Sequence, residues 1–508
     1  MMKKLFLCLL LAGIFVQVSS AQTAALHINI ANTSSPICYL WIPGYSLTFD
    51  FLKKGSTDLV LNKQKTGLYT ISLTQPMFVI LSCSSDTANS KSLIYRFFIS
   101  PGDNLFFKAD FNQKDNGIIV TGKGSNNNQP LIAGLADINV EKFNGDTLPY
   151  RAITAINKQY TLNKNAFNAY LTKYKPSASF IKSWQYNLSY YVPGTYYSFK
   201  EQAKYYAQDA YYRNIAKWEH VKDSLFSAVK LSNDDALSAE YYLGLLRDFL
   251  LREKERLWEA SHQEAPADFY KQWYNANIEE GQKLFLDDET NLLEEKIIHK
   301  YFTGKAAEYE YAVLFDGSLE GHNPKNLVQI FERFKKQYPR SKYVEWFKPS
   351  IDSIVKRQQR PLSKEMVFVT DNGTKLNTLD DVLAITKGKT VLVDMWGTWC
   401  GPCRMEIENN SQAIKTYFKG KGLDYLYIAN RDMDNEKKWK ELIAYFDLKG
   451  IHILANEKLS TDIMGKVKGT GYPTYVIIKK DGTYEQSKAG FPMKRDVLIK
   501  QLEDALAQ

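Results

Sequence analysis

The sequence predicts a multidomain protein with an N-terminal antiparallel β-sandwich or barrel, an α-helical middle domain and a C-terminal α/β domain. Its 508 residues exceed what one hydrophobic core usually serves. Short strand-like runs fill the first part of the chain, and strands alternate with helices in the last part. We place the three domains at residues 22–129, 130–357 and 361–508.

The first residues have the pattern of an export signal. Lys3 and Lys4 precede the apolar run from Leu5 to Val18, and the small residues Ser19-Ser20-Ala21 suit a cleavage site. We therefore expect a signal peptide at residues 1–21. The net charge of +9 is spread without a block of like charges, so no nucleic-acid partner is expected.

Strand-like runs in the N-terminal domain are rich in β-branched and aromatic residues and are separated by Gly, Asn, Ser and Pro. This spacing is typical of a small antiparallel sandwich or barrel. The expected strands are Leu26–Ile30, Tyr39–Ile42, Leu59–Leu61, Tyr69–Leu73, Phe78–Cys83, Tyr95–Ile99 and Asn104–Lys108. Cys38 and Cys83 both lie in strand-like text. They could form a structural disulfide in an exported protein or remain two buried thiols.

The middle domain has apolar residues at helical spacing with charged residues between them. The expected helices are Phe199–Leu231, Asp235–His262, Ala267–Phe285 and Glu289–Phe302. Tyrosine pairs such as Tyr190-Tyr191 and Tyr196-Tyr197 recur here. They could form a stacking surface for sugars or peptides, because tyrosine offers contact area and a hydroxyl. We favour the alternative that they pack between helices.

The C-terminal domain alternates strands and helices, which predicts a mainly parallel sheet covered by helices. The expected strands are Met366–Thr370, Thr390–Met395, Leu423–Ala429 and His452–Ala455, followed by a hairpin of Thr474–Ile478 and Tyr484–Ala489 around Asp481-Gly482. The expected helices are Thr378–Thr386, Cys403–Lys419, Glu436–Phe446, Ser460–Val467 and Lys494–Leu506.

The motif Trp399-Cys400-Gly401-Pro402-Cys403 directly follows a predicted strand and carries the main functional signal. A strand that ends here delivers Cys400 to a helix N-terminus, where unpaired N–H groups stabilise a thiolate. The pKa of such a thiol falls from about 8.5 toward about 7. Cys400 would then attack a substrate disulfide, and Cys403 would resolve the mixed disulfide.

Two further residues fit this chemistry. Asp394 lies within an apolar strand, where burial raises the pKa of a carboxyl, so it could accept the proton of Cys403. It could instead be a water-linked structural residue. Pro473 precedes a strand, and we predict a cis bond that exposes the backbone of Tyr472 to substrate. A simple strand-start proline is the alternative.

Other roles for the cysteine pair fit less well. Half a zinc site would need two more ligands, and no Cys or paired His lies nearby in sequence, so no metal or other cofactor is expected. A structural disulfide across so short a loop would stabilise little. The sequence setting of a peroxidatic cysteine is absent. We therefore predict a redox-active disulfide between Cys400 and Cys403.

Residues 361–508 resemble the thioredoxin superfamily, most closely the exported thiol–disulfide reductases of the TlpA/ResA group. The matching text runs from Val393 through the two cysteines to Glu406, and includes Gly471-Tyr472-Pro473-Thr474. The resemblance implies a thioredoxin fold, and Gly-Pro between the cysteines is the thioredoxin choice, which implies a reductase. The TlpA/ResA group usually carries a proline near the position of Glu408. This chain has no proline there, so the resemblance does not imply the helix kink that such a proline causes.

The N-terminal part loosely resembles the β domain that precedes such domains in Bacteroidetes proteins, through Ile99-Ser100-Pro101-Gly102-Asp103 and Thr121-Gly122-Lys123-Gly124-Ser125. This resemblance implies a periplasmic location. We therefore expect a periplasmic thiol–disulfide oxidoreductase whose partners are disulfide-containing client proteins and a membrane thiol electron donor. Trp399 would cover the sulfur pair, and Tyr472 with Pro473 would shape the substrate groove. The alternative is a cell-envelope binding or scaffold protein with an accessory redox domain.

Overall fold

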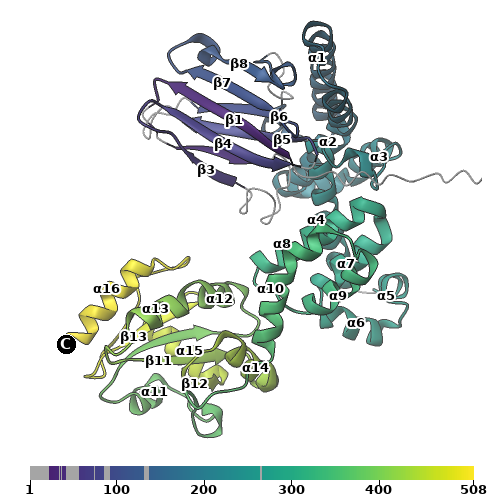
Figure 1. Ribbon diagram of the computed structural model, residues 1–508. Coiled ribbons are helices and arrows are strands. Elements are labelled where there is room, and N and C mark those ends of the chain that lie inside the picture. The colour runs from purple at the N-terminus through teal and green to yellow at the C-terminus, as the bar shows by residue number, and fades with distance from the viewer. Residues whose placement is uncertain are drawn as a thin grey trace, which may run out of the picture. The chain divides into compact units, whose positions relative to one another are not determined.

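The computed structural model describes residues 22–33, 35, 37–41, 56–73, 75–84, 92–130, 137–263 and 266–508 (Figure 1). The expected signal peptide at 1–21 lies outside these residues. The described residues form two compact units, one within 22–278 with 296–313 and one from 279–295 with 314–508. The predicted succession of β-rich, helical and α/β parts is confirmed.

The N-terminal part is a sandwich of two four-stranded sheets. One sheet has the order β4 (Thr66–Leu73), β1 (Gln22–Ala31), β7 (Asn104–Asp110) and β8 (Ile119–Lys123). The other has the order β3 (Ser56–Val60), β2 (Ile37–Trp41), β5 (Met77–Ser84) and β6 (Ser92–Ile99). The pairing is antiparallel except between β1 and β7, which are parallel. Parallel neighbours need a long crossover, and the whole second sheet lies between them in sequence.

Cys38 and Cys83 lie directly opposite each other on β2 and β5 and are joined by a disulfide. Both side chains are buried in the core between the two sheets. Of the two alternatives for these cysteines, the structure therefore has the bridge. The cross-link closes a loop with a sequence separation of 45 residues.

Replacing both Cys38 and Cys83 by alanine should lower the free energy of unfolding by about 2–4 kcal/mol, because the unfolded chain regains the entropy that the loop had lost. Urea unfolding of the full chain, followed through the β-rich part by hydrogen exchange, measures the difference. The wild-type protein with this bridge reduced is the control that separates the cross-link from lost packing. Equal stability of the variant and the oxidised wild type would contradict the prediction.

The helical part shares a core with the second sheet. Phe78 and Phe98, on the outer face of that sheet, belong to the same buried cluster as Phe180 and Trp184 of α2. Arg96 of β6 forms a 2.8 Å ion pair with Glu240. The helices of this region are α1 (Tyr150–Tyr174), α2 (Ala178–Arg213), α3 (Ile215–Phe226), α4 (Glu240–Ser261), α5 (Ala267–Tyr274), α6 (Ile278–Asp287), α7 (Asn291–Tyr301), α8 (Gly304–Glu320), α9 (Leu327–Gln337) and α10 (Lys342–Gln358). The sandwich thus packs together with α1, α2 and α3 around one shared cluster.

The tyrosine pairs pack mainly inside the helical part. Tyr190, Tyr191, Tyr196 and Tyr197 are all buried. The Tyr190 hydroxyl donates to the carbonyl oxygen of Lys230 at 2.8 Å, which satisfies it internally. The buried pairs match the helix-packing interpretation, whereas Tyr205 and Tyr206, on the same helix, are 74% and 59% exposed.

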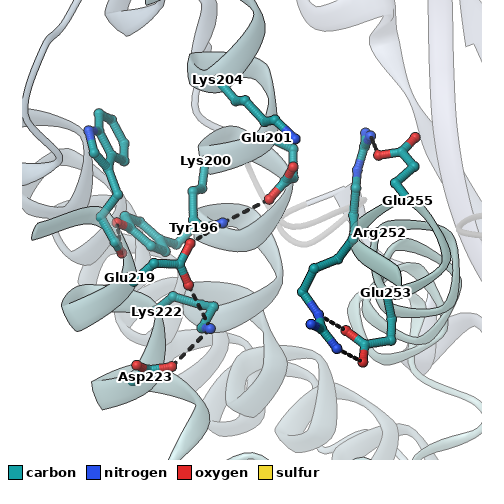
Figure 2. Close-up of polar contacts among 12 residues, drawn as sticks. Tyr196, Lys200, Glu201, Lys204, Glu219, Lys222, Asp223, Arg252, Glu253 and Glu255 are labelled. Atoms are coloured by element: carbon teal, nitrogen blue, oxygen red, sulfur yellow. Dashed lines mark hydrogen bonds and ion pairs between the residues drawn. The ribbon is translucent and has the colours of Figure 1, made fainter. Parts of the chain in front are cut away.

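A buried ion network joins α2 to α3 (Figure 2). Lys200 Nζ lies 2.8 Å from Glu201 and 2.7 Å from Glu219, and its side chain is only 8% exposed. Glu219 also pairs with Lys222. Each buried charge has an oppositely charged partner, which offsets the cost of removing it from water. We therefore assign the network a structural role in joining the two helices.

The C-terminal part contains a six-stranded mixed sheet. Its order is β14 (Tyr484–Gln486), β13 (Thr474–Ile478), β10 (Thr390–Trp396), β11 (Leu423–Asn430), β12 (Gly450–Ala455) and β9 (Met366–Phe368). The pairs from β10 to β9 are parallel, while β13 and β14 are antiparallel, as the Asp-Gly hairpin predicts. The helices are α11 (Leu379–Ile385), α12 (Gly401–Glu406), α13 (Gln412–Tyr417), α14 (Glu436–Phe446), α15 (Glu457–Val467) and α16 (Arg495–Leu506).

The central strand β10 is buried along its whole length because helices cover both faces of the sheet. Val391 and Val393 pack with α11 and α15, whereas Leu392 packs with α13 and α16. Alternation along the strand therefore places Asp394 on the same face as Leu392. Among the residues that the structure describes, no helix has the length and apolar character needed to cross a membrane.

The long helix expected after the cysteines is divided. Between α12 and α13 lies one π-helical turn, Ile407–Ser411. Such a turn widens a helix locally and is frequent at functional sites. It includes Glu408, the residue that stands near the family's usual proline. Helix α10, which precedes the C-terminal sheet in sequence, packs on α14.

Candidate redox site

The dithiol lies at the end of the central strand. Cys400 is the N-cap of α12, and the Cys403 N–H donates to Cys400 Sγ at 3.2 Å. Pro402 occupies the first turn, where its missing N–H costs nothing. The two sulfurs are bonded, and both side chains are buried. The site is therefore an oxidised Cys-x-x-Cys pair at a helix N-terminus, as the motif predicts.

The loop that delivers Cys400 is held by the end of the neighbouring strand β11. Asp432 is fully buried and accepts hydrogen bonds from the N–H of Thr398 at 2.7 Å and from its hydroxyl at 2.6 Å. Asn430 donates to the carbonyl oxygen of Trp396 at 2.6 Å. These bonds fix the turn before Cys400. The sequence analysis missed both residues, although a polar triplet directly after a buried parallel strand is a recognisable signal.

Trp399 and Tyr472 meet beside the dithiol. Trp399 is 47% exposed, and its ring centre lies 5.9 Å from that of Tyr472 in an edge-to-face arrangement. The Trp399 indole N–H donates to the carbonyl oxygen of Asn430 at 3.0 Å, and the guanidinium of Arg431 lies 5.7 Å from its ring centre. The Tyr472–Pro473 peptide bond is cis. The structure thus brings the expected substrate-binding residues together, with Trp399 after the end of β10 and Tyr472 and Pro473 before the start of β13.

Asp394 is buried beneath α12, and its Oδ1 has no hydrogen-bond partner among the described residues. Burial first, and then the charge of Glu406, raise the pKa of Asp394 to about 7. The charge of Lys415 acts in the opposite direction. A carboxyl with this pKa can take up and release a proton near neutrality.

Glu406 is a functional candidate that the sequence analysis missed. It is buried, accepts from Asn410 Nδ2 at 2.5 Å and accepts from the N–H of Met493 at 3.1 Å. Its position three residues after Cys403 places it on the inner face of the same helix. That spacing was a usable signal, but a glutamate after the motif also fits a solvent-facing position.

A small cavity of about 20 Å³ lies among Asp394, Glu406, Ser411 and Tyr427. This volume is sufficient for one water molecule, and the polar groups around it could hydrogen-bond one. Asp394 and Glu406 therefore line one common cavity.

Lys415 supplies the cation of this buried cluster. Burial lowers the pKa of Lys415 to about 8, and its ammonium lies 5.1 Å from the ring centre of Tyr427. His452, also buried, has its pKa lowered by burial to about 4 and therefore stays neutral. Within the described part of the chain, no group of three or more His, Cys, Asp or Glu side chains is placed to hold a metal ion.

A dithiol at a helix N-terminus on a mixed parallel sheet, with a buried carboxyl behind it, defines a thiol–disulfide oxidoreductase of the thioredoxin class. A family model described as Thioredoxin-like matches residues 388–484. The thiol-disulfide oxidoreductase ResA of a Bacillus cereus strain is 33% identical over 129 residues, which cover 25% of this chain and 69% of that protein. The chain belongs to the TlpA/ResA-like thiol–disulfide oxidoreductases of the thioredoxin superfamily.

Further relatives match the same part of the chain. ResA of Bacillus thuringiensis subsp. konkukian is 30% identical over 144 residues, which cover 28% of this chain and 78% of that protein. Among solved structures, a putative thiol-disulfide oxidoreductase from Bacteroides vulgatus is 26% identical, with a TM-score of 0.21, and covers 25% of this chain and 78% of that one. The kinship of residues 22–129 with a Bacteroidetes β domain stays a prediction.

Proposed function

We propose that the protein is an exported thiol–disulfide oxidoreductase that acts mainly as a reductase of client proteins. The observation that carries this proposal is the Cys400–Cys403 pair at the N-terminus of α12, with Asp394 buried behind it. The pattern of residues 1–21 supports export. The loose resemblance of residues 22–129 to a Bacteroidetes β domain supports the periplasm as the compartment.

In the reductive direction, the thiolate of Cys400 attacks one sulfur of the client disulfide. That S–S bond breaks, a mixed disulfide forms, and the leaving client thiolate takes up a proton. Cys403 then loses its proton to Asp394, directly or through the cavity shared with Glu406, and attacks Cys400 Sγ. The second client thiolate leaves and is protonated. The client gains two electrons and two protons, and Cys400 and Cys403 become a disulfide.

An external dithiol must return these two electrons and two protons by the same exchange in reverse. We propose a thiol carrier in the membrane as the donor. The direction rests on Gly401-Pro402 between the cysteines and on Asp394, both of which match the thioredoxin pattern.

The reduction potential of the full chain tests the direction. We expect a value near that of thioredoxin, about −270 mV, and reduction of insulin disulfides in a coupled assay. Equilibration with glutathione buffers, followed by thiol labelling of Cys400, measures it. A variant with both Cys400 and Cys403 changed to serine sets the baseline. A value near about −120 mV would overturn the reductase assignment in favour of an oxidase.

A further inference from the structure

Three cationic side chains near the dithiol have no acidic ion-pair partner in the described part of the chain. Arg404 lies one helical turn after Cys400, and its buried Nε has no hydrogen-bond partner there. Arg431 lies over the ring of Trp399. Lys438 is near the start of α14, and its pKa is lowered by burial and then by the charges of Lys325 and Arg404. We call Arg404, Arg431 and Lys438 the cationic collar.

The collar is continuous with the loop that holds the dithiol. Beyond the effect of burial, the charge of Arg404 lowers the pKa of Lys438 and the charge of Asp432 raises it. Asp432 follows Arg431 directly, but both of its carboxylate oxygens already accept hydrogen bonds from Thr398. Asp432 therefore holds the turn before Cys400 through its hydrogen bonds, while its charge acts on Lys438 without a direct ion pair.

Arg404 forms no ion pair among the described residues, and the nearby carboxylate of Glu408 pairs with other side chains. Glu408 is four residues further along and could pair with it across one helical turn. Instead, Glu408 Oε1 accepts from Arg357 of α10, and Glu408 Oε2 lies 3.0 Å from His322 Nδ1. Burial raises the pKa of Glu408, but these hydrogen bonds outweigh burial and the pKa is lowered overall. Arg357 and His322 thus hold the Glu408 carboxylate, so that it does not pair with Arg404.

A cleft lies beside this helix face. It has a volume of about 360 Å³ and is lined by Ser318, His322, Asn323, Arg357, Glu408 and Tyr445, among others. Burial lowers the pKa of Arg404, and the charge of Tyr445, which lines the cleft, acts in the opposite direction. Cys400 lies at the start of α12, Arg404 lies within it, and Glu408 lies in the π-helical turn that follows. Glu408 therefore links the helix that begins at the dithiol to the cleft.

We propose that the cationic collar and this cleft bind an acidic segment of the client, so that the enzyme prefers disulfides flanked by Asp or Glu. This inference rests on the proposed reductase function. A half-buried guanidinium without a counter-charge is costly, and a client carboxylate would relieve that cost. Arginine also suits carboxylates geometrically, since its two parallel N–H groups match their two oxygens.

Two disulfide peptides test the proposal, identical except for two Glu or two Lys residues beside the cysteines. The reduced full chain is mixed with each peptide, and tryptophan fluorescence gives the second-order rate constant. We expect the acidic peptide to react about tenfold faster at low salt, and the ratio to shrink in about 0.5 M salt. Equal rates for both peptides at low salt would overturn the proposal.

Charge variants locate the preference. Arg404→Gln combined with Lys438→Gln should bring the acidic-to-basic ratio close to one, and the rate of the same variant with the uncharged bis(2-hydroxyethyl) disulfide serves as the reference for its intrinsic reactivity. Lys440→Gln is the matched control, because Lys440 is on the same helix but already pairs with Glu436 at 2.6 Å. A ratio that survives the double change would overturn the role of the collar.

A second pair of variants tests whether the ion pair of Glu408 with Arg357 keeps Glu408 from pairing with Arg404. Arg357→Gln should free Glu408 to neutralise Arg404 and lower the ratio, whereas Glu408→Gln should keep it. The opposite order would overturn this step. The uncharged disulfide separates the two proposals: if it is not reduced at all, the reductase function fails, and if it is reduced without any charge preference among peptides, only the collar proposal fails.

Discussion

A Cys403→Ala variant is expected to accumulate mixed disulfides with its substrates, whereas a Cys400→Ala variant is not. Cys400 is the N-cap of α12 and receives the N–H of Cys403, so it is the sulfur whose thiolate the helix stabilises. Without Cys403, no other free thiol of the described residues is present to displace the trapped client, because Cys38 and Cys83 are bonded to each other. Turnover should fall by at least about 10³-fold in both variants, because two groups that act as a unit fail together.

Non-reducing electrophoresis of each reduced variant after mixing with insulin measures the trapping, and mass spectrometry of the adduct identifies the bonded cysteine. The double variant with both cysteines changed to alanine is the control for adducts at Cys38 or Cys83. Equal trapping by the two single variants would show that the roles of attacking and resolving cysteine are assigned wrongly.

An Asp394→Asn variant is expected to be more stable than the wild type at neutral pH, by about 4 kcal/mol at most. The folded protein raises the pKa of Asp394 from 3.8 to about 7, chiefly through burial, and this rise corresponds to that free energy. Below pH about 4 the carboxyl is protonated in both folded and unfolded chains, so it costs nothing. Between pH about 4 and 7 only the unfolded chain loses the proton, so wild-type stability falls as pH rises.

Native-state hydrogen exchange of the β10 amides at pH 5 to 8 measures this difference in the redox part of a multidomain chain. Asp504→Asn, on the exposed face of α16, is a matched control that should leave the pH dependence unchanged. Parallel stability curves for wild type and Asp394→Asn would contradict the prediction. The same change should also slow release of the mixed disulfide at pH 7, because Cys403 loses its proton acceptor.

Local patterns were sufficient for much of the redox part. The helix predicted at Glu436–Phe446 has those bounds in the structure, because its apolar spacing and its ends are encoded within the segment itself. Asp394 was recognisable because a carboxylate in an apolar strand is costly unless it has a role. The helix predicted at Phe199–Leu231 was wrong as a single element, since α2 ends at Arg213 and α3 begins at Ile215. Periodicity does not reveal such a break when both segments are amphipathic.

The amino-acid sequence alone determined the chemistry, because the spacing of Cys400 and Cys403 after an apolar strand specifies a dithiol at a helix start. Only the tertiary structure decided what surrounds it. Glu406 joins Asp394 at a buried cavity because helix and strand faces meet there. Glu408 is held by Arg357 and His322, which come from elements far earlier in the chain. Burial and charge pairing depend on these distant neighbours, and no local pattern contains them.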